Sequence, residues 1–362
     1  MTEMRMLDKS AGLCLLSAVV IGMALPGNAM AIKAEPETSP TAVVNPSNGE
    51  QWCFFVDNEH EIAYWHHSKS TEGWVKGVVG GSVKAGTSPS AVIYKTGEIF
   101  VYYVNANGEI ANWTYSESKW VGRAFGGKVE TGSSPFAATN TENLVQYVFY
   151  VNSGGEVADF FLNKEGWHGP SAIGGAVKAK TSPTAVVYAT GEAFAYYVNS
   201  SSEIANWTYS ESKWAGRAFG GKVETGSSPF AATNAANGVQ FVFYVNSSKE
   251  VGDFFANKEG WHGPSAIGGA VKAKTSPTAV IYASGEAFAY YVNSSSEIAN
   301  WTYSESKWVG RAFGGKVETG SSPFAATYTS NNEQYVFYAN GSAEISDFAY
   351  VVPGEWIGPT TL

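Results

Sequence analysis

One internal repeat accounts for almost the whole chain and limits it to folds built from equivalent units. A first version of the repeat occupies residues 89–134, 183–228 and 277–322, and the last two copies differ at three positions. A second version alternates with it and occupies residues 134–181, 228–275 and 322–362. A chain with this periodicity buries its apolar surface by stacking successive units against one another.

Ser-Pro pairs mark the beginning of seven units. They end at Pro40, Pro89, Pro135, Pro183, Pro229, Pro277 and Pro323, which are 49, 46, 48, 46, 48 and 46 residues apart. In the unit that follows Pro183, four runs are strand-like, at residues 184–188, 193–199, 203–209 and 214–221. Gly, Ser and Asn clusters separate these runs, and no helical period extends beyond one turn. Four strands in about 47 residues are typical of a propeller blade.

The pattern predicts an all-β fold, a seven-bladed β-propeller of four-stranded antiparallel blades that forms one domain over residues 32–362. The Asn105-Ala106-Asn107-Gly108 segment predicts a tight hairpin, because Asn-Gly accepts positive φ. The seventh unit ends at Leu362 without the GGAVKAKTSP stretch that follows the fifth, and residues 31–40 (AIKAEPETSP) resemble that stretch. We therefore expect the N-terminal segment of the mature chain to complete the last blade and close the ring.

Residues 1–31 have the features of a secretory signal peptide. Basic residues precede an apolar stretch at about residues 11–25, and Ala29-Met30-Ala31 offers small residues for cleavage. The apolar stretch is too short for a membrane span, so we expect no membrane insertion. The expected product is a secreted protein, extracellular or periplasmic. Its mature part has one cysteine, Cys53, and hence no internal disulfide.

Composition and motifs exclude several classes of function. The formal net charge is −9 and the sequence contains no basic patch, so we expect no nucleic-acid partner. The histidines lack the spaced cysteine or carboxylate partners of a metal site, and no phosphate loop or nucleophile elbow occurs. We therefore expect no metal, no cofactor and no catalytic residues, and predict that the protein is not an enzyme.

Tryptophan occupies two recurrent positions. One recurs in every unit, as Trp74, Trp120, Trp167, Trp214, Trp261, Trp308 and Trp356. The other is Trp113, Trp207 and Trp301, and by alignment Trp65, where the remaining units have Phe160, Phe254 and Phe348. These rings either only pack between blades or also form the wall of a sugar pocket, since pyranose C–H groups can lie on a π surface. Both interpretations stay open.

Polar side chains recur beside these rings. Asn112, Asn206 and Asn300 precede the alternating tryptophans, and Asp159, Asp253 and Asp347 precede the phenylalanines. Such groups either bind a neighbouring turn or take sugar hydroxyls while a ring takes the apolar face. Arg123, Arg217 and Arg311 follow in Trp-x-Gly-Arg, either as solvated surface residues or as donors to two ring hydroxyls. The repetition predicts multivalent binding, and the alternation predicts two classes of cleft, of which about three are strong sites.

The succession SPxAV…Y-V…EIANW…W-G…GG-V…SP resembles the repeat family of the PLL-like seven-bladed lectins of insect-pathogenic bacteria, and it covers residues 32–362. The resemblance implies sugar sites in clefts between consecutive blades, L-fucose and related sugars as ligands, and oligomerisation of whole propellers. Family members often carry an aromatic residue followed by histidine in the third strand, where this chain has Asn-Trp-Thr-Tyr or Asp-Phe-Phe. The identity of the sugar therefore stays open.

The sequence thus predicts a secreted, multivalent, carbohydrate-binding lectin for fucosylated or related glycans on cell surfaces or glycoproteins, with homo-oligomers as one expected assembly. The alternative is a protein-interaction or surface-structural propeller without a sugar ligand. A third interpretation, a hydrolase, needs a unique polar cluster. Only the first unit, with His60, His66 and His67, offers a candidate for it.

Overall fold

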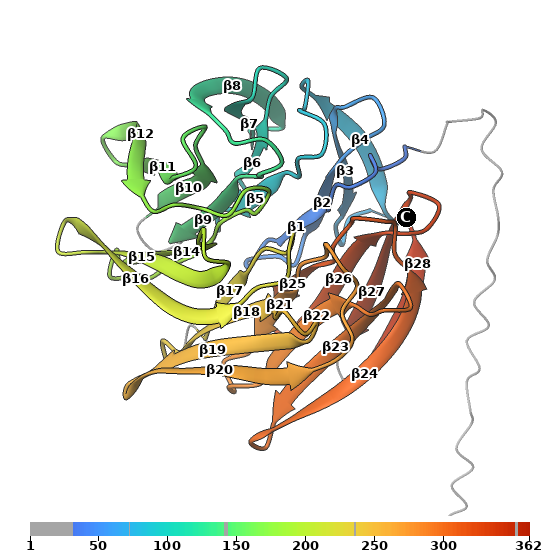
Figure 1. Ribbon diagram of the computed structural model, residues 1–362. Helices are drawn as coiled ribbons and strands as arrows, with labels where there is room; N and C mark the ends of the chain where they lie inside the picture. Colours follow the sequence, from blue (N-terminus) through green and yellow to red (C-terminus); the bar gives the residue numbers. More distant parts are fainter. Residues whose placement is uncertain (1–31, 72, 141–143, 235–236, 352–353) are drawn as a thin grey trace, which may run out of the picture. The chain divides into compact units, whose positions relative to one another are not determined.

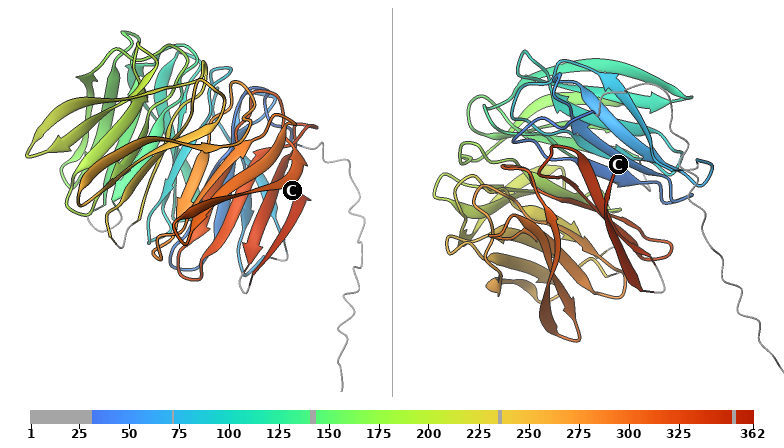
Figure 2. Two further views of the ribbon diagram at one scale, coloured as in Figure 1. Left: turned by 60° about the horizontal axis from the view of Figure 1, so that its bottom comes forward. Right: turned by 90° about the vertical axis from the view of Figure 1, so that its right-hand side faces the viewer.

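The repeat folds as predicted, into seven separate sheets. The computed structural model describes residues 32–71, 73–140, 144–234, 237–351 and 354–362, so the predicted signal peptide, residues 1–31, lies outside the described residues. The described part forms 28 strands in seven four-stranded antiparallel sheets, each in chain order (Figure 1). Figure 2 shows these sheets side by side as blades. No helix of the length and hydropathy that a membrane span requires occurs among these residues.

The blades are numbered in chain order, and each uses four consecutive strands. Blade 1 comprises β1 (Thr41–Val44), β2 (Gln51–Val56), β3 (Ile62–His67) and β4 (Val75–Gly80). Blade 2 comprises β5 (Ser90–Ile93), β6 (Ile99–Val104), β7 (Glu109–Ser116) and β8 (Lys119–Lys128). Blade 3 comprises β9 (Phe136–Asn140), β10 (Val145–Val151), β11 (Val157–Asn163) and β12 (Gly166–Gly174). Blade 4 comprises β13 (Thr184–Val187), β14 (Ala193–Val198), β15 (Glu203–Ser210) and β16 (Lys213–Lys222).

The remaining three blades have the same composition. Blade 5 comprises β17 (Phe230–Thr233), β18 (Gln240–Val245), β19 (Val251–Asn257) and β20 (Gly260–Gly268). Blade 6 comprises β21 (Thr278–Ile281), β22 (Ala287–Val292), β23 (Glu297–Ser304) and β24 (Lys307–Lys316). Blade 7 comprises β25 (Phe324–Tyr328), β26 (Glu333–Ala339), β27 (Ile345–Val351) and β28 (Glu355–Thr361). The strands of blade 4 agree with the four predicted runs to within two residues at each end.

The predicted hairpin between β6 and β7 is confirmed. The N–H of Gly108 donates to the carbonyl of Asn105 at 2.7 Å, and Gly108 has a φ of 74°. The side-chain oxygen of Asn105 accepts from the N–H groups of Asn107 and Glu109 at 2.9 and 3.1 Å. The asparagine side chain therefore stabilises the turn by accepting two backbone hydrogen bonds, and glycine supplies the left-handed backbone conformation that the turn requires.

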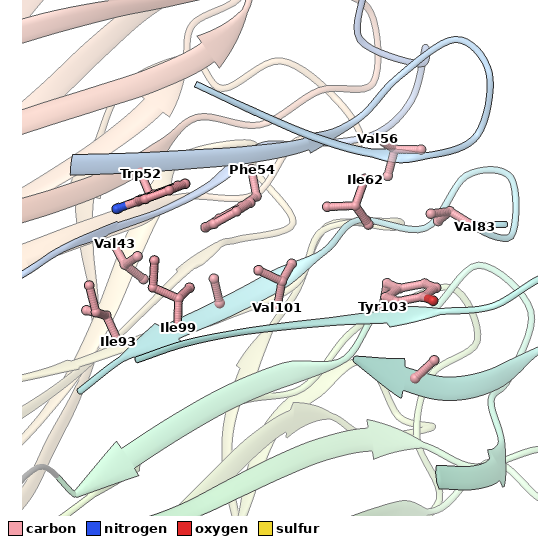
Figure 3. Packing of buried hydrophobic residues seen from close by; sticks show 12 residues of the cluster. Val43, Trp52, Phe54, Val56, Ile62, Val83, Ile93, Ile99, Val101 and Tyr103 are labelled. Carbon is pink, nitrogen blue, oxygen red and sulfur yellow. The ribbon is translucent and has the colours of Figure 1, made fainter. Parts of the chain in front are cut away.

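The core lies between blades and not within one sheet. Both faces of the second strands are buried, because alternate side chains point to the preceding and the following blade. In β2, Trp52 and Phe54 join the cluster shared with blade 2 (Figure 3). Cys53 and Phe55 join the cluster shared with blade 7. Cys53 is free and buried. Each blade therefore depends on both neighbours for its burial.

The N-terminal segment closes the ring, but it does so as a linker. All four strands of blade 7 come from the C-terminal end of the chain. The N–H of Ala34 donates to the carbonyl of Ala343 in blade 7 at 2.7 Å, and that of Glu35 donates to Val56 in blade 1 at 2.8 Å. The pair Val83 and Lys84 makes the same two bonds between blades 1 and 2. Residues 34 and 35 thus replace the connection that the seventh unit lacks.

Seven serines complete this closure with a ring of hydrogen bonds. The Oγ atom of each accepts from the backbone N–H of the equivalent serine in the preceding unit, at 2.8–2.9 Å. The serines are Ser39, Ser88, Ser134, Ser182, Ser228, Ser276 and Ser322. The ring surrounds an axial cavity of about 600 Å³, which Phe136, Phe230 and Phe324 also line. The recurrent Ser-Pro pairs are therefore the inner contacts of the propeller.

Candidate functional site

Two types of interface alternate around the ring, as the two types of repeat predicted. We call the contacts of blades 1 and 2, 3 and 4, and 5 and 6 the odd–even interfaces. The contacts of blades 2 and 3, 4 and 5, and 6 and 7 are the even–odd interfaces. Blades 7 and 1 meet at the closure. Each type assembles a different set of the predicted site residues.

The tryptophan that begins each fourth strand packs against the preceding blade in all seven cases. Its ring lies edge-on to an aromatic ring of that blade's second strand, with centroids 5.7–6.1 Å apart. The pairs are Trp74–Phe337, Trp120–Phe54, Trp167–Tyr102, Trp214–Phe149, Trp261–Tyr196, Trp308–Phe243 and Trp356–Tyr290. Edge-to-face contacts of this kind stabilise an aromatic core. All seven rings therefore pack between blades, and their contact with sugar stays a prediction.

The alternating tryptophans Trp113, Trp207 and Trp301 lie half-buried at the odd–even interfaces. The indole N–H of Trp207 donates to the carbonyl of Gly174 in blade 3 at 3.1 Å, and Trp113 and Trp301 make the same bond. A Cβ atom on Gly216 would lie 2.9 Å from the Trp207 ring, so the fourth strand requires glycine there. Each indole therefore donates to a backbone carbonyl of the preceding blade and lies against a glycine of its own fourth strand. Binding of sugar by these indoles stays a prediction.

Asn112, Asn206 and Asn300 face the even–odd interfaces but are buried there. The Nδ2 of Asn206 donates to the Oγ1 of Thr208 at 3.1 Å, and the other two asparagines make the same contact with Thr114 and Thr302. In the sheet of blade 4, Asn206 of β15 lies opposite Tyr196 of β14, whose hydroxyl donates to the Oε1 of Gln240 in blade 5. The amides therefore belong to a buried polar layer behind the surface of the interface.

Arg123, Arg217 and Arg311 are exposed and point over the even–odd interfaces. Their guanidinium carbons lie 4.8, 5.0 and 5.0 Å above the rings of Phe125, Phe219 and Phe313. Each phenylalanine in turn contacts the fourth-strand tryptophan of the next blade at 4.5–4.7 Å, namely Trp167, Trp261 and Trp356. The structure thus brings together one predicted arginine and one predicted tryptophan at each of these interfaces.

A cavity of about 490 Å³ opens at the even–odd interface of blades 4 and 5. Aromatic walls come from Tyr188 and Phe194 of blade 4 and from Trp261 of blade 5. Polar groups are the carboxylate of Glu192 and the amides of Gln240 and Asn257; the remaining lining residues are Ala189, Thr190, Gly238, Ala256 and Gly260. Apolar rings with a few convergent polar groups are what a small-molecule site requires.

Hydrogen bonds fix the polar groups of this cavity. The hydroxyl of Tyr188 donates to the carbonyl of Gly238 at 2.8 Å, which ties blade 4 to blade 5. Burial raises the pKa of Tyr188, so its hydroxyl stays protonated at neutral pH. The Oγ1 of Thr190 donates to a carboxylate oxygen of Glu192 at 3.2 Å and leaves the other oxygen without a bond from that residue. Glu192 can therefore accept a hydrogen bond from a ligand hydroxyl.

Of the described residues that line this cavity, the sequence singled out Trp261 but not the tyrosine, glutamate and phenylalanine of blade 4; Arg217 is not among them. A signal for them exists in the repeat. The tyrosine is Tyr94, Tyr188 and Tyr282 in blades 2, 4 and 6, and the glutamate is Glu98, Glu192 and Glu286. Both residues flank the turn between the first and second strands of the blade. This turn lies outside the Ser-Pro pairs and the Trp-x-Gly-Arg motif.

Buried aspartates replace the asparagines at the odd–even interfaces. Asp159 and Asp253 are each 3% exposed, and their Oδ1 atoms have no hydrogen-bond partner among the described residues. Burial raises the pKa of Asp159 to about 7 and that of Asp253 to about 6. Asp347, at the closure, has its pKa raised by burial to about 6. These carboxyl groups lose or gain charge in the range of neutral and mildly acidic pH.

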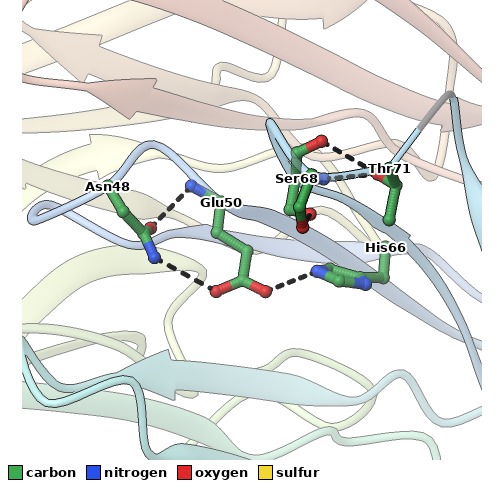
Figure 4. Close-up of polar contacts among 6 residues, drawn as sticks. Asn48, Glu50, His66, Ser68 and Thr71 are labelled. Atoms are coloured by element: carbon green, nitrogen blue, oxygen red, sulfur yellow. Dashed lines mark hydrogen bonds and ion pairs between the residues drawn. The ribbon is translucent and has the colours of Figure 1, made fainter.

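Two of the three histidines of blade 1, His60 and His66, each have their own carboxylate partner. The Nε2 of His66 lies 2.6 Å from Glu50, whose carboxylate also contacts Asn48 (Figure 4). The Nδ1 of His60 lies 3.1 Å from Glu35. Across the described residues, no three His, Cys, Asp or Glu side chains gather as metal ligands.

Comparison with known proteins gives matches in structure and not in sequence. No family model matches the chain, and no curated protein is significantly similar to it. BP39L lectin from Burkholderia pseudomallei superposes with a TM-score of 0.78 at 15% identity, over 91% of this chain and 99% of that chain. A variant of Aleuria aurantia lectin, solved with α-methyl-L-fucoside, gives 0.61 at 18% identity over 80% and 99%.

A third match is SapL1 lectin, also solved with α-methyl fucoside. Its TM-score is 0.59 at 17% identity, over 92% of this chain and 98% of that chain. These identities are too low to show common function, but the superpositions cover most of every chain. The chain therefore shares the β-propeller fold of these lectins.

Proposed function

We propose that the protein is a secreted, multivalent lectin that binds fucose or related neutral sugars at the even–odd interfaces. The cavity between blades 4 and 5 carries this proposal. The rings of Trp261 and Phe194 offer an apolar surface to the C–H groups of a pyranose, and the Glu192 carboxylate accepts from its hydroxyls. A sugar needs both kinds of contact on opposite parts of one ring.

The comparisons supply the first sugar to test. Aleuria aurantia lectin and SapL1 lectin, which have the same fold, were both solved with α-methyl fucoside. Fucose has an apolar face that includes its methyl group, and this suits a cavity walled by aromatic rings. Fucosylated glycans on cell surfaces or glycoproteins are therefore the proposed partners.

Repetition of the arginine, phenylalanine and tryptophan arrangement at three interfaces supports multivalency. Single sites for a monosaccharide are expected to have Kd values from millimolar to micromolar, about −4 to −8 kcal/mol. Several sites on one rigid ring raise the apparent affinity for a glycan-coated surface about a hundredfold or more. Association of whole propellers into homo-oligomers would raise it further.

Binding without catalysis fits the polar groups that the structure describes. The hydrolase interpretation depended on His60, His66 and His67, but His60 and His66 are engaged with separate carboxylates. The carboxylates at the even–odd interfaces recur in three blades and do not form one asymmetric centre. We therefore propose that the protein is not an enzyme.

Calorimetric titration of the full chain with α-methyl-L-fucoside tests the proposal. We expect saturable binding, and Trp261→Ala should weaken it at least tenfold. The control is Trp207→Phe, which introduces at that position the residue that blade 5 has at Phe254; because Trp207 lies outside the cavity, binding should persist. Equal loss in both variants would place the site at Trp207, as the sequence allowed. No binding of fucose or of any glycan on an array would refute the proposal.

A second function is favoured by exposed apolar residues on the fourth strands. Val121, Val309 and Ile357 are exposed on β8, β24 and β28. Such residues suit a protein-interaction propeller that has no sugar ligand. Equal binding to native and to enzymatically deglycosylated target cells would support this alternative, whereas loss of binding on deglycosylation supports the lectin.

A further inference from the structure

The even sides are nearly identical in blades 4 and 6, and blade 2 differs from them by Lys95 at the position of Ala189, whereas the odd sides all differ. Residues 183–228 and 277–322, which include blades 4 and 6, differ at three positions, and none of these lines the cavity except Thr190, which is Ser284 in blade 6. Blades 3, 5 and 7 are more diverged from one another. Between the interface of blades 4 and 5 and that of blades 6 and 7, a difference in ligand binding must therefore come mainly from the odd blades.

Two positions on the odd side differ greatly in size. One precedes the second strand and is Leu144, Gly238 and Asn332 in blades 3, 5 and 7. The other pairs in register with the fourth-strand tryptophan and is Leu162, Ala256 and Tyr350. Both blade 5 residues line the cavity between blades 4 and 5. Blade 5 thus has the smallest side chains at both places.

The exposed fraction of the even-blade tyrosine depends on the size of these two odd-blade residues. At the interface of blades 2 and 3, Tyr94 and Phe100 are 4% and 8% exposed. Their counterparts between blades 4 and 5, Tyr188 and Phe194, are half-buried and accessible from the cavity. Between blades 6 and 7 the corresponding tyrosine, Tyr282, is 7% exposed, whereas Phe288 is half-buried like Phe194. The tyrosine of the even side is therefore accessible where blade 5 supplies glycine and alanine, and covered at the other two interfaces.

We propose that the interface of blades 4 and 5 is the principal monosaccharide site, and that Ala256 and Gly238 determine this by leaving Tyr188 uncovered. The inference rests on the proposed function and narrows three similar sites to one strong site. Among the described residues that line the cavity, Glu192 has the only charged side chain, so the preferred ligand is a neutral pyranose and not an acidic sugar.

Exchange of residues between the blades tests this inference. Ala256→Leu introduces the residue that blade 3 has at Leu162, so the fold is expected to tolerate it. In titrations with α-methyl-L-fucoside we expect a loss of affinity of at least tenfold at the strong site. The control is Ala215→Val, which introduces the residue of Val121 and Val309 on an exposed strand; affinity and stoichiometry should equal those of the wild type.

The reverse exchange should create a site. Leu144→Gly together with Leu162→Ala gives blade 3 the small residues of blade 5, and we expect a second strong site with a stoichiometry of about two per chain. N-acetylneuraminic acid should bind none of the proteins at the concentration where α-methyl-L-fucoside saturates. Thermal unfolding of each variant shows whether a lost site reflects a lost fold.

The outcomes separate the inference from the proposed function. Wild-type binding that is unchanged in Ala256→Leu, or three equal sites in the wild type, would overturn the inference and leave the lectin intact. A wild type that binds neither α-methyl-L-fucoside nor other neutral monosaccharides would overturn the proposed function and the inference with it. Loss in Ala256→Leu and gain in the blade 3 variant would establish both.

Discussion

The interfaces on the two sides of blade 4 use equivalent positions in opposite ways. Between blades 3 and 4, Phe161 and Tyr209 join the same hydrophobic cluster as Trp207 and Trp214. Between blades 4 and 5, the equivalent positions hold Thr208 and Ala256, and a cavity lies beside Ala256. The backbone register of third and fourth strands brings both pairs to the outer part of the interface. Two small residues therefore separate a packing interface from a candidate binding site.

Replacement of Trp207 by alanine should have the largest effect on stability. The variant removes a half-buried indole and leaves the carbonyl of Gly174 without its donor. We expect a loss of about 3 kcal/mol in the free energy of unfolding, measured by urea denaturation. Trp207→Phe should recover most of this loss. A stable Trp207→Ala variant with weakened sugar binding would instead make the odd–even interfaces the binding sites.

Ionisation of Asp159 should have the next largest effect on the free energy of unfolding. It makes the stability of the odd–even interface of blades 3 and 4 depend on pH, whereas the even–odd interfaces have asparagine at this position. Its pKa is raised to about 7 by burial, so between about pH 4 and pH 7 the folded chain binds more protons than the unfolded chain. The contribution of this group to stability is therefore present at low pH and is lost as pH rises through 7. Its neighbours Tyr147 and Tyr150 have pKa values near 12 and stay protonated in this range.

Asp159→Asn, which introduces the residue of the even blades, should remove that loss. We expect the variant to gain about 2 kcal/mol over the wild type on going from pH 5 to pH 8, from denaturant unfolding at both values. Asn206→Asp should create the opposite dependence at the even–odd interface. A stability difference between variant and wild type that is the same at pH 5 and pH 8 would show that Asp159 is charged throughout.

Arg217→Ala should have the smallest effect. The guanidinium lies on Phe219, which contacts Trp261 of the cavity wall, but it is exposed, so the free energy of unfolding should change by less than about 0.5 kcal/mol. Binding of α-methyl-L-fucoside should weaken about threefold if the arginine donates to a sugar hydroxyl. Arg311→Ala is the matched control at the interface of blades 6 and 7, where Tyr350 replaces alanine, and it should leave binding unchanged. Equal effects of both variants would argue for equivalent sites.

Most of the fold was predictable from the sequence because the repeat carries it. The regular spacing of the Ser-Pro pairs predicted the seven blades, and the repeat-like stretch at residues 31–40 predicted that the N-terminal segment closes the ring. Less of the candidate site was predictable. Asn206 stands next to Trp207 in sequence, but adjacent residues of a strand face opposite blades, so the two lie at different interfaces. The cavity depends on the small side chain of Ala256, and its effect can be recognised only when the residues that surround it in space are known.

The number of blades has a consequence for the alternation itself. Two unit types can alternate without interruption only around a ring with an even number of members. With seven members one unit must stand between neighbours that cannot both be of the opposite type. Blade 1 has this place: its third strand carries Tyr64 where the others have asparagine or aspartate. It meets blade 7 through a shared hydrophobic cluster and through the hydrogen bond of Ser322 to Ser39. A seven-bladed propeller of this design therefore cannot be symmetric, and the contact of blades 7 and 1 is the place where the alternation is interrupted.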